Sequence, residues 1–338
     1  MGHVAPALAV AEALQRRGVL VTFAGSPDRV EATLVPERGY AFDSFTVSGL
    51  PRRPGVALLR AVARALAAPM ACLRILRKRR PDVVLGAGGY VAGPMVLAAR
   101  LRGIPCALTE ADAHLGLANR LSAPLADRVF LALPVGRHGE KYRPVGRPIP
   151  AASQPRPRDE ARAAFGLSPD AQVVLVFGGS LGARLLNDIA LDAWAESGPA
   201  VIHLCGARDY PDLRDRVSRP DFLRPFIEEI GLAYGAADIV LARAGGSVWE
   251  LAAAGLPAVL VPGEFATGAH QEKNARWFVD AGGAVVVPET DVSTAPRVVA
   301  ELLADAGRLA AMAAAMRDAA KPHAAEEIAD ELVGLARR

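Results

Sequence analysis

The sequence has few aromatic residues, few cysteines and no long uninterrupted apolar run. Aromatics make up 5% of the 338 residues, and Cys72, Cys106 and Cys205 lie far apart in apolar stretches. Three scattered thiols argue against a disulfide framework or a cysteine-rich metal site, and they indicate the reduced core thiols of a cytosolic protein. Apolar runs are interrupted by Arg, Gly or Pro before they reach about 18 residues, so we expect neither a signal peptide nor a membrane-spanning helix.

Positive and negative charges nearly balance. The formal net charge is +3, and no basic stretch is interleaved with stacking aromatics, which argues against nucleic-acid binding. Residues 51–81 are the exception, because they hold nine Arg or Lys and no acid. Arginines at helical spacing with apolar residues, broken at Pro69, are typical of a helix on an anionic membrane surface and equally of a core-facing helix with a solvated face.

Apolar runs that end near glycine and precede a helical pattern recur along the whole chain. They cover residues 19–25, 82–86, 104–110, 127–131, 172–178, 200–206, 238–242, 257–262 and 283–288. Runs without polar alternation are typical of strands buried on both faces. The sequence therefore predicts an α/β fold with parallel sheets covered by helices.

The length suits two domains, and a proline-rich stretch between residues 146 and 171 places the boundary near residue 150. We expect a first domain over residues 1–149, a second over residues 150–322, and a C-terminal helix within residues 323–338 that is a candidate to pack back on the first domain. Residues 86–105 and 243–257 share one pattern of glycine turn, short helix and strand. This repeat predicts two doubly wound domains that face each other across a ligand-binding cleft.

The stretch VVLVFGGSLGARLLND (residues 173–188) reads as strand, glycine turn and helix start. Backbone N–H groups of Gly178, Gly179 and Ser180 at a helix N-terminus would suit a diphosphate. The glycines could instead serve only a tight turn. The same letters satisfy Gly-x-Ser-x-Gly, in which Ser180 is a hydrolase nucleophile, but such a site needs a histidine at a later strand end. The available histidines, His203, His270 and His323, fit a two-domain pattern poorly.

A second glycine turn, in residues 242–255, ends at a predicted helix. Gly245 and Gly246 make the turn, Ser247 is the expected N-cap, and Glu250 lies in the first helical turn. Its carboxylate could accept both hydroxyls of a ribose or could simply complement the helix dipole. A nicotinamide site at GAGGYV, with Glu110 as ribose ligand, has weaker support because the last glycine of the fingerprint is absent.

Six motifs in this order and spacing resemble the MurG family of N-acetylglucosaminyltransferases over essentially the whole chain. They are GHVAPALAVAEAL, GAGGYVAGP, LGLANRL, VFGGSLGARLLN, RAGGSVWELAAAGLPAVLVP and HQEKNARWF. The resemblance implies a GT-B fold and inverting transfer of N-acetylglucosamine from UDP-N-acetylglucosamine to the 4-hydroxyl of N-acetylmuramoyl-pentapeptide on undecaprenyl diphosphate. It also implies a peripheral protein at the cytoplasmic face of the membrane, anionic lipid contact through residues 51–81, and no metal or cofactor.

The same resemblance assigns roles to individual residues. His3 matches the candidate general base, because an imidazole can take the proton of a sugar hydroxyl as the bond forms. Gly2, Tyr90 and Asn119 match acceptor positions. The donor positions are matched by Gly179, Ser180, Arg243, Gly246, Ser247, Glu250, His270, Gln271 and Asn274. Without the family resemblance, the local sequence favours other interpretations. His3 would then be a surface residue, the His270–Asn274 segment a capped helix start, and Arg243 and Arg184 solvated cations.

The chain departs from the family pattern mainly on the acceptor side. The family's first strand is not seen before Gly2, and we expect a late start codon or a truncation. Of the family's HEQN only Glu110 is kept, and Pro150 stands where the family has an arginine, with Arg147 as a candidate substitute. Two alternatives therefore stay open, namely a related UDP-sugar transferase with another acceptor and a UDP-binding chain without activity.

Overall fold

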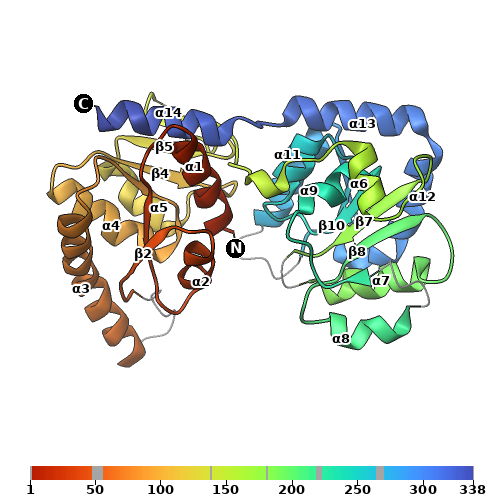
Figure 1. The fold of residues 1–338 in the computed structure, drawn as a ribbon, viewed down its shortest axis with the longest axis horizontal. Coiled ribbons are helices and arrows are strands. Elements are labelled where there is room, and N and C mark those ends of the chain that lie inside the picture. The colour runs from red at the N-terminus through yellow and green to blue at the C-terminus, as the bar shows by residue number, and fades with distance from the viewer. Residues whose placement is uncertain are drawn as a thin grey trace. The chain divides into compact units, whose positions relative to one another are not determined.

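The computed structural model describes residues 2–47, 56–137, 139–179, 182–217, 223–263 and 270–337, with the side chains of residues 56–66 and 270 outside the description. The chain divides into two units, shown in Figure 1. The first unit comprises Met1–Pro150 together with Pro322–Arg338, and the second comprises Ala151–Lys321. The chain therefore enters and leaves the second unit between two parts of the first.

The first unit is built on parallel strands. One sheet pairs β1 (Thr22–Gly25) with β2 (Ala41–Ser44), and another has the order β3-β4-β5-β6. The latter strands are β3 (Val84–Gly86), β4 (Cys106–Glu110), β5 (Arg128–Leu131) and β6 (Tyr142–Pro144). The helices before α14 are α1 (Val4–Arg16), α2 (Glu31–Glu37), α3 (Val56–Arg79), α4 (Gly89–Leu101), α5 (Leu117–Ser122) and the 3-10 turn η1 (Ala123–Leu125). Strand β4 is buried along its whole length, as expected for an apolar run covered on both faces, whereas β1 is mostly half-buried.

The last helix, α14 (Ala324–Ala336), packs on α1 within the first unit (Figure 1). Ile328 and Leu332 of α14 share a buried cluster with Val10 of α1. At the rim of this contact Arg16 pairs with Glu326 at 2.7 Å. The C-terminal residues therefore complete the core of the first unit.

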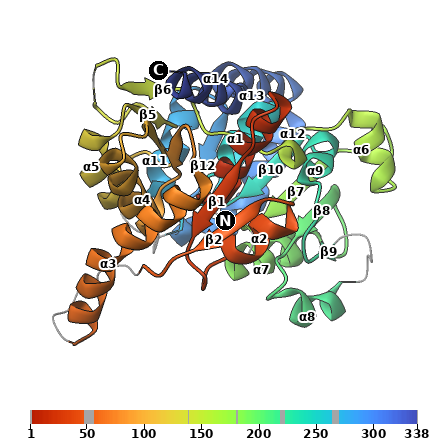
Figure 2. The ribbon, with the colours of Figure 1, turned by 60° about the vertical axis from the view of Figure 1, so that its left-hand side comes forward.

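Helix α3 runs without interruption through Pro69, so the break expected there is wrong. A proline removes one helical hydrogen bond, and we attribute the continuity to the buried stripe of Ala68, Cys72 and Leu76, since α3 packs along α4 (Figure 2). Burial raises the pKa of the Cys72 thiol to about 12. Of the basic stretch, residues 51–55 and the side chains of residues 56–66 lie outside the described part. No helix in the described residues is long and apolar enough to cross a membrane.

The second unit has a parallel sheet of order β12-β11-β10-β7-β8-β9. Its strands are β7 (Val173–Phe177), β8 (Ala200–Leu204), β9 (Leu223–Arg224), β10 (Ile239–Ala242), β11 (Ala258–Leu260) and β12 (Ala284–Val286). The α-helices are α6 (Arg158–Ala164), α7 (Arg184–Trp194), α8 (Tyr210–Leu213), α9 (Ile230–Ala236), α10 (Val248–Ala254), α11 (His270–Asp280), α12 (Ala295–Ala304) and α13 (Ala306–Ala319). The 3-10 turns are η2 (Ala151–Ser153), η3 (Arg214–Arg216) and η5 (Glu289–Thr294). A core cluster of buried residues joins α7 and α12 to one face of this sheet.

Each of the nine apolar runs contains a strand, which confirms the α/β interpretation. The strands β2, β6 and β9 are not predicted by any such run. All three lie at the edge of their sheets. An edge strand is covered less completely and needs no continuous apolar run.

Candidate functional site

The two glycine loops of the second unit leave neighbouring strands. Phe177 at the end of β7 pairs with Ala242 at the end of β10, so the loops that follow begin side by side at one edge of the sheet. The sheet order also changes direction here, because β8 lies beyond β7 on one side and β11 beyond β10 on the other. This switch point is where doubly wound sheets bind ligands.

The loop after β7 depends on glycine for close packing. A Cβ at Gly178 would collide with Ala183, and one at Gly182 would collide with the carbonyl oxygen of Cys205. Gly179 has a φ of +93°, a conformation that favours glycine. The loop leads into the N-terminus of α7, whose dipole favours an anion. Ser180 lies outside the described residues.

The loop after β10 leads to Glu250. This carboxylate is partly exposed in the first turn of α10, and Tyr234 Oη donates a 2.7 Å hydrogen bond to its Oε2 atom. Burial, together with the charge of Glu250, holds the pKa of Tyr234 well above its usual value, so the tyrosine remains a donor. Gly246 and Ser247 are half-buried in the turn. Ser247 occupies the N-cap position, but it makes no side-chain cap hydrogen bond, so the expected cap is wrong. Its backbone is helical, with φ −62° and ψ −18°, whereas a capping serine normally has a non-helical backbone.

Both cations considered from the sequence have carboxylate partners. Arg243 pairs with Glu289 and donates to the carbonyl of Val261 at 3.2 Å, which ties the ends of β10 and β11 together. Arg184 pairs with Asp188 at 3.2 Å. Arg243 therefore braces the edge of the sheet at this site.

Helix α11 begins beside the end of β11. Gln271 Oε1 accepts a 2.9 Å hydrogen bond from the backbone N–H of Gly263. Asn274, one turn further, is only 1% exposed, and neither atom of its amide has a hydrogen-bond partner among the described residues. His270 is the first residue of α11, but its side chain lies outside the described part.

In the first unit, His3 lies against the loop that follows β3. It occupies the N-cap of α1, and a Cβ at Gly88 would lie 2.8 Å from His3 Nδ1. Arg147 donates to the carbonyl of Gly2 at 2.6 Å and to that of Ala111 at 3.1 Å. The start of α1 is thereby tied to the loops after β4 and β6.

Asn119 is buried and holds the loop after β4. Its Nδ2 atom donates to the carbonyl of Thr109 at 3.1 Å and to Glu110 Oε2 at 2.9 Å. The Glu110 carboxylate also accepts from the backbone N–H groups of Gly116 and Asp112. Asn119 thus shapes this loop, whereas Tyr90, at the start of α4, is 60% exposed and open to a ligand.

Sequence reasoning missed the residues that hold the site residues in place. Tyr234 and Gly88 stand far from Glu250 and His3 in the chain, and no local pattern links them. Arg147 could be found only as a substitute for a family arginine, not as a partner of Gly2. The structure argues against the hydrolase interpretation. His203, the first histidine after Ser180 in the sequence, is buried and bonded to Asn187, and burial lowers its pKa to about 4.

Two family models together cover most of the chain. Residues 1–131 match the glycosyltransferase family 28 N-terminal domain, and residues 173–332 match the glycosyltransferase family 28 C-terminal domain. A protein of Salinibacter ruber is 40% identical over 100% of this chain and 95% of its own length. One of a Nocardioides species is 44% identical over 93% of this chain and 90% of its own. Both are named UDP-N-acetylglucosamine--N-acetylmuramyl-(pentapeptide) pyrophosphoryl-undecaprenol N-acetylglucosamine transferase.

A solved structure gives the same result. The crystal structure of Acinetobacter baumannii MurG is 30% identical in sequence, with a TM-score of 0.79 over 98% of this chain and 96% of that one. Two α/β units with parallel sheets, matching the N- and C-terminal domains of one glycosyltransferase family in this order, agree with the GT-B fold expected from the sequence.

Proposed function

Because the chain belongs to glycosyltransferase family 28, we propose that it transfers N-acetylglucosamine from UDP-N-acetylglucosamine to the 4-hydroxyl of N-acetylmuramoyl-pentapeptide carried on undecaprenyl diphosphate. The names of its relatives support this donor and this acceptor. The observation that carries the proposal is the pair of glycine loops at the switch point of the second unit, with Glu250 oriented by Tyr234. The reaction would be a step of peptidoglycan synthesis.

The donor would bind at this edge of the second unit. The loop containing Gly179 and Ser180 would hold the diphosphate through backbone N–H groups, supported by the dipole of α7. Glu250 would accept hydrogen bonds from the ribose hydroxyls. The start of α11 would contact the sugar through Gln271, with His270 at its first position and the unpartnered amide of Asn274 buried behind them, where it would meet the donor only if the helix start moves on binding. Gly246 and Ser247 would form the wall of the site, and Arg243 would brace it.

The acceptor would bind to the first unit, beside Gly2, His3 and Tyr90. His3 would take the proton of the 4-hydroxyl while its oxygen bonds to C1 of N-acetylglucosamine. The bond from C1 to the diphosphate oxygen breaks in the same displacement, so the anomeric configuration inverts and UDP leaves. The N–H groups of the glycine loop would stabilise the charge that develops on the leaving diphosphate. Asn119 would keep the acceptor loop in shape through Glu110.

A membrane surface is the third partner, at the cytoplasmic face where a peripheral protein would meet the lipid-linked acceptor. Helix α4 packs against both α3 and α5 (Figure 2). Each of these three helices has exposed apolar side chains. We call this region the α3–α5 surface; its members are Met70, Leu97, Leu101, Leu117 and Leu121, with the exposed cations Arg74, Arg77, Arg100 and Arg120 nearby in sequence. Apolar side chains among arginines favour an anionic bilayer surface.

The test is transfer of radiolabelled N-acetylglucosamine from its UDP donor to a lipid-linked muramoyl-pentapeptide analogue. The wild-type chain should form the β-linked disaccharide, and His3→Ala should lower kcat by about 10²-fold or more, as expected for loss of a general base. The KM for the donor should stay within about twofold, because His3 belongs to the first unit. Binding of UDP without transfer to this acceptor would contradict the proposed acceptor, and unchanged turnover of His3→Ala would exclude His3 as the base.

A further inference from the structure

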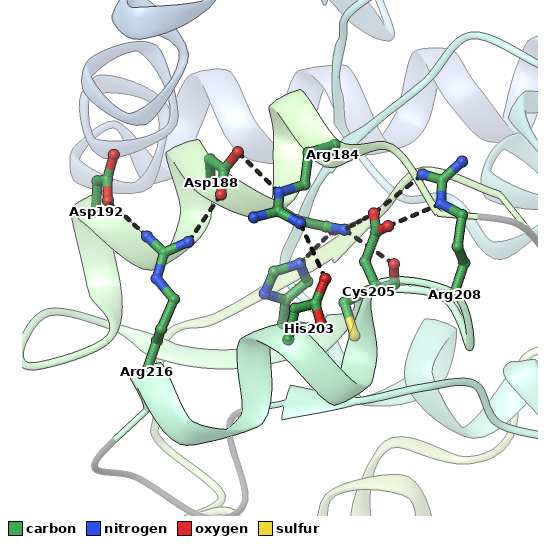
Figure 3. Close-up of polar contacts among 10 residues, drawn as sticks. Arg184, Asp188, Asp192, His203, Cys205, Arg208 and Arg216 are labelled. Carbon is green, nitrogen blue, oxygen red and sulfur yellow. Dashed lines mark hydrogen bonds and ion pairs between the residues drawn. The ribbon is translucent and has the colours of Figure 1, made fainter.

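A buried polar network joins helix α7 to the loop that follows β8 (Figure 3). Asn187 of α7 and His203 of β8 are fully buried. His203 Nε2 lies 3.0 Å from Asn187 Oδ1. Because that amide oxygen can only accept, His203 Nε2 carries the proton in this pair. Both side chains are therefore held in one orientation inside the second unit.

The other end of Asn187 reaches the backbone and a carboxylate. Asn187 Nδ2 donates to the carbonyl of Cys205 at 3.0 Å and to Asp209 Oδ2 at 2.9 Å. Asp209 is buried and also receives two hydrogen bonds from Arg208, whose side chain is 60% exposed. These contacts with Arg208 hold the pKa of Asp209 below its ordinary value, so the carboxylate stays charged. The network thus fixes the whole segment from Cys205 to Asp209.

That segment also packs directly against Gly182, at the end of the glycine turn after β7. Gly182, with a φ of +78°, packs so closely on the Cys205 carbonyl that a Cβ would collide with it. Asn187 binds the same carbonyl. Any shift of the Cys205 peptide towards Gly182 must therefore move Gly182 as well.

We propose that Asn187, together with His203 and Asp209, positions Gly182, which packs on the Cys205 carbonyl at the start of α7, so that the glycine turn after β7 can bind the diphosphate of the donor. The proposal rests on the proposed function and specifies which part of the nucleotide depends on this network. None of the three side chains would touch the donor, so they are positioning residues. Loosening the Cys205 peptide should weaken contacts with the diphosphate and leave contacts with the nucleoside intact.

Calorimetric binding of UDP and of uridine to the full chain separates these two parts. Asn187→Ala removes both hydrogen bonds to the Cys205–Asp209 segment, and we expect the Kd for UDP to rise about tenfold, equivalent to about 1.4 kcal/mol. The Kd for uridine, which lacks the diphosphate, should stay within about twofold of the wild-type value. Asp209→Asn keeps the side-chain shape and weakens the network less, so it decides the question if Asn187→Ala does not fold. Asp192→Asn, an exposed change on the same helix, is the matched control and should alter neither Kd.

Each outcome has one meaning. Loss of UDP affinity with uridine affinity retained supports the proposal. Unchanged UDP affinity in a folded variant, or an equal loss for UDP and uridine, overturns it, because the network would then support either nothing at the site or the whole unit. Absence of UDP binding by the wild-type chain would instead refute the proposed function itself, and this inference with it.

Discussion

At the scale of single residues, the position of His3 depends on a cation from elsewhere in the first unit. His3 makes no side-chain cap hydrogen bond to α1, whereas Arg147 holds the carbonyl of the preceding residue and that of Ala111. The planar guanidinium of arginine has several N–H donors in fixed directions and can bind two carbonyls at once, which the single ammonium group of lysine does less well. Arg147 therefore fixes the backbone directly before His3 and, with it, the position of the proposed base.

We expect Arg147→Ala to lower kcat for transfer by about tenfold or more, because two hydrogen bonds from a charged group are lost near the base. Donor KM should be unchanged, and Arg147→Lys should recover part of the activity. Steady-state kinetics with both substrates measure this. If Arg147→Ala raised the donor KM and left kcat intact, Arg147 would not be acting through His3.

Glu250 gives a second prediction at this scale. Glu250→Ala should weaken UDP binding by about tenfold, since hydrogen bonds to a charged acceptor contribute about 1.5–3 kcal/mol. Binding of 2′-deoxy-UDP should be affected much less, because that ligand has already lost one ribose hydroxyl. Calorimetry on the four combinations of protein and ligand gives the coupling. An equal loss for both nucleotides would place the carboxylate away from the ribose.

The same residues show how far sequence reasoning reaches. The glycine turns and the place of Glu250 follow from strand and helix patterns, because each is set by neighbours within a few positions. Tyr234 and Arg147 could not be found in this way, since their partners are brought to them by the fold. Asn274 was selected only through the family motif, and its buried amide is a feature that no local pattern reveals.

At the scale of elements, apolar runs predict the interior strands of the described residues and some edge strands, since β1, β3 and β12 are predicted whereas the edge strands β2, β6 and β9 are not. Strands β4, β7 and β10 are buried along their whole length, and continuous runs of aliphatic residues are the signature of that burial. Strand β2 has two half-buried residues between two exposed ones and no fully buried position, so it carries little signal. In helix α3 the sequence predicts a break that the structure does not have. The proline at position 69 indicates a helix end, but packing on α4 keeps the helix continuous.

The α3–α5 surface yields a prediction for a group of elements. Changing Leu97 and Leu121 together to Glu should reduce binding to vesicles containing phosphatidylglycerol several-fold. Two exposed apolar side chains that would enter the bilayer are lost, and the two carboxylates that replace them are repelled by the anionic lipid. Cosedimentation with vesicles measures the bound fraction. Leu20→Glu changes another exposed leucine of the first unit and serves as the matched control. Equal vesicle binding by the double variant and the control would contradict a membrane role for this surface.

At the scale of the whole molecule, one buried histidine makes the stability of the second unit depend on pH. The pKa of His203 is about 4 in the folded protein and near 6.5 when unfolded, so the unfolded chain binds the proton first. Stability is therefore full above about pH 6.5 and falls as the pH drops towards 4. Between pH 7 and pH 5 this residue alone should remove about 2 kcal/mol from the free energy of unfolding.

Urea unfolding of the wild type and of His203→Gln at the two pH values isolates this contribution. Glutamine keeps an N–H donor for Asn187 but does not titrate, so the variant should be less stable at pH 7 and should lose less on acidification. The same pH dependence in both proteins would assign the effect to other groups.

The order of the chain has a consequence for how the protein is made. Helix α14, which covers α1, lies beyond the whole of the second unit in the chain and therefore leaves the ribosome after it. The second unit is complete before α14 has been synthesised, so it can fold while the first still exposes the apolar face of Val10 and Leu14. During translation the core of the first unit thus closes only after the second unit has been synthesised, and until then a chaperone would have reason to shield its exposed apolar face.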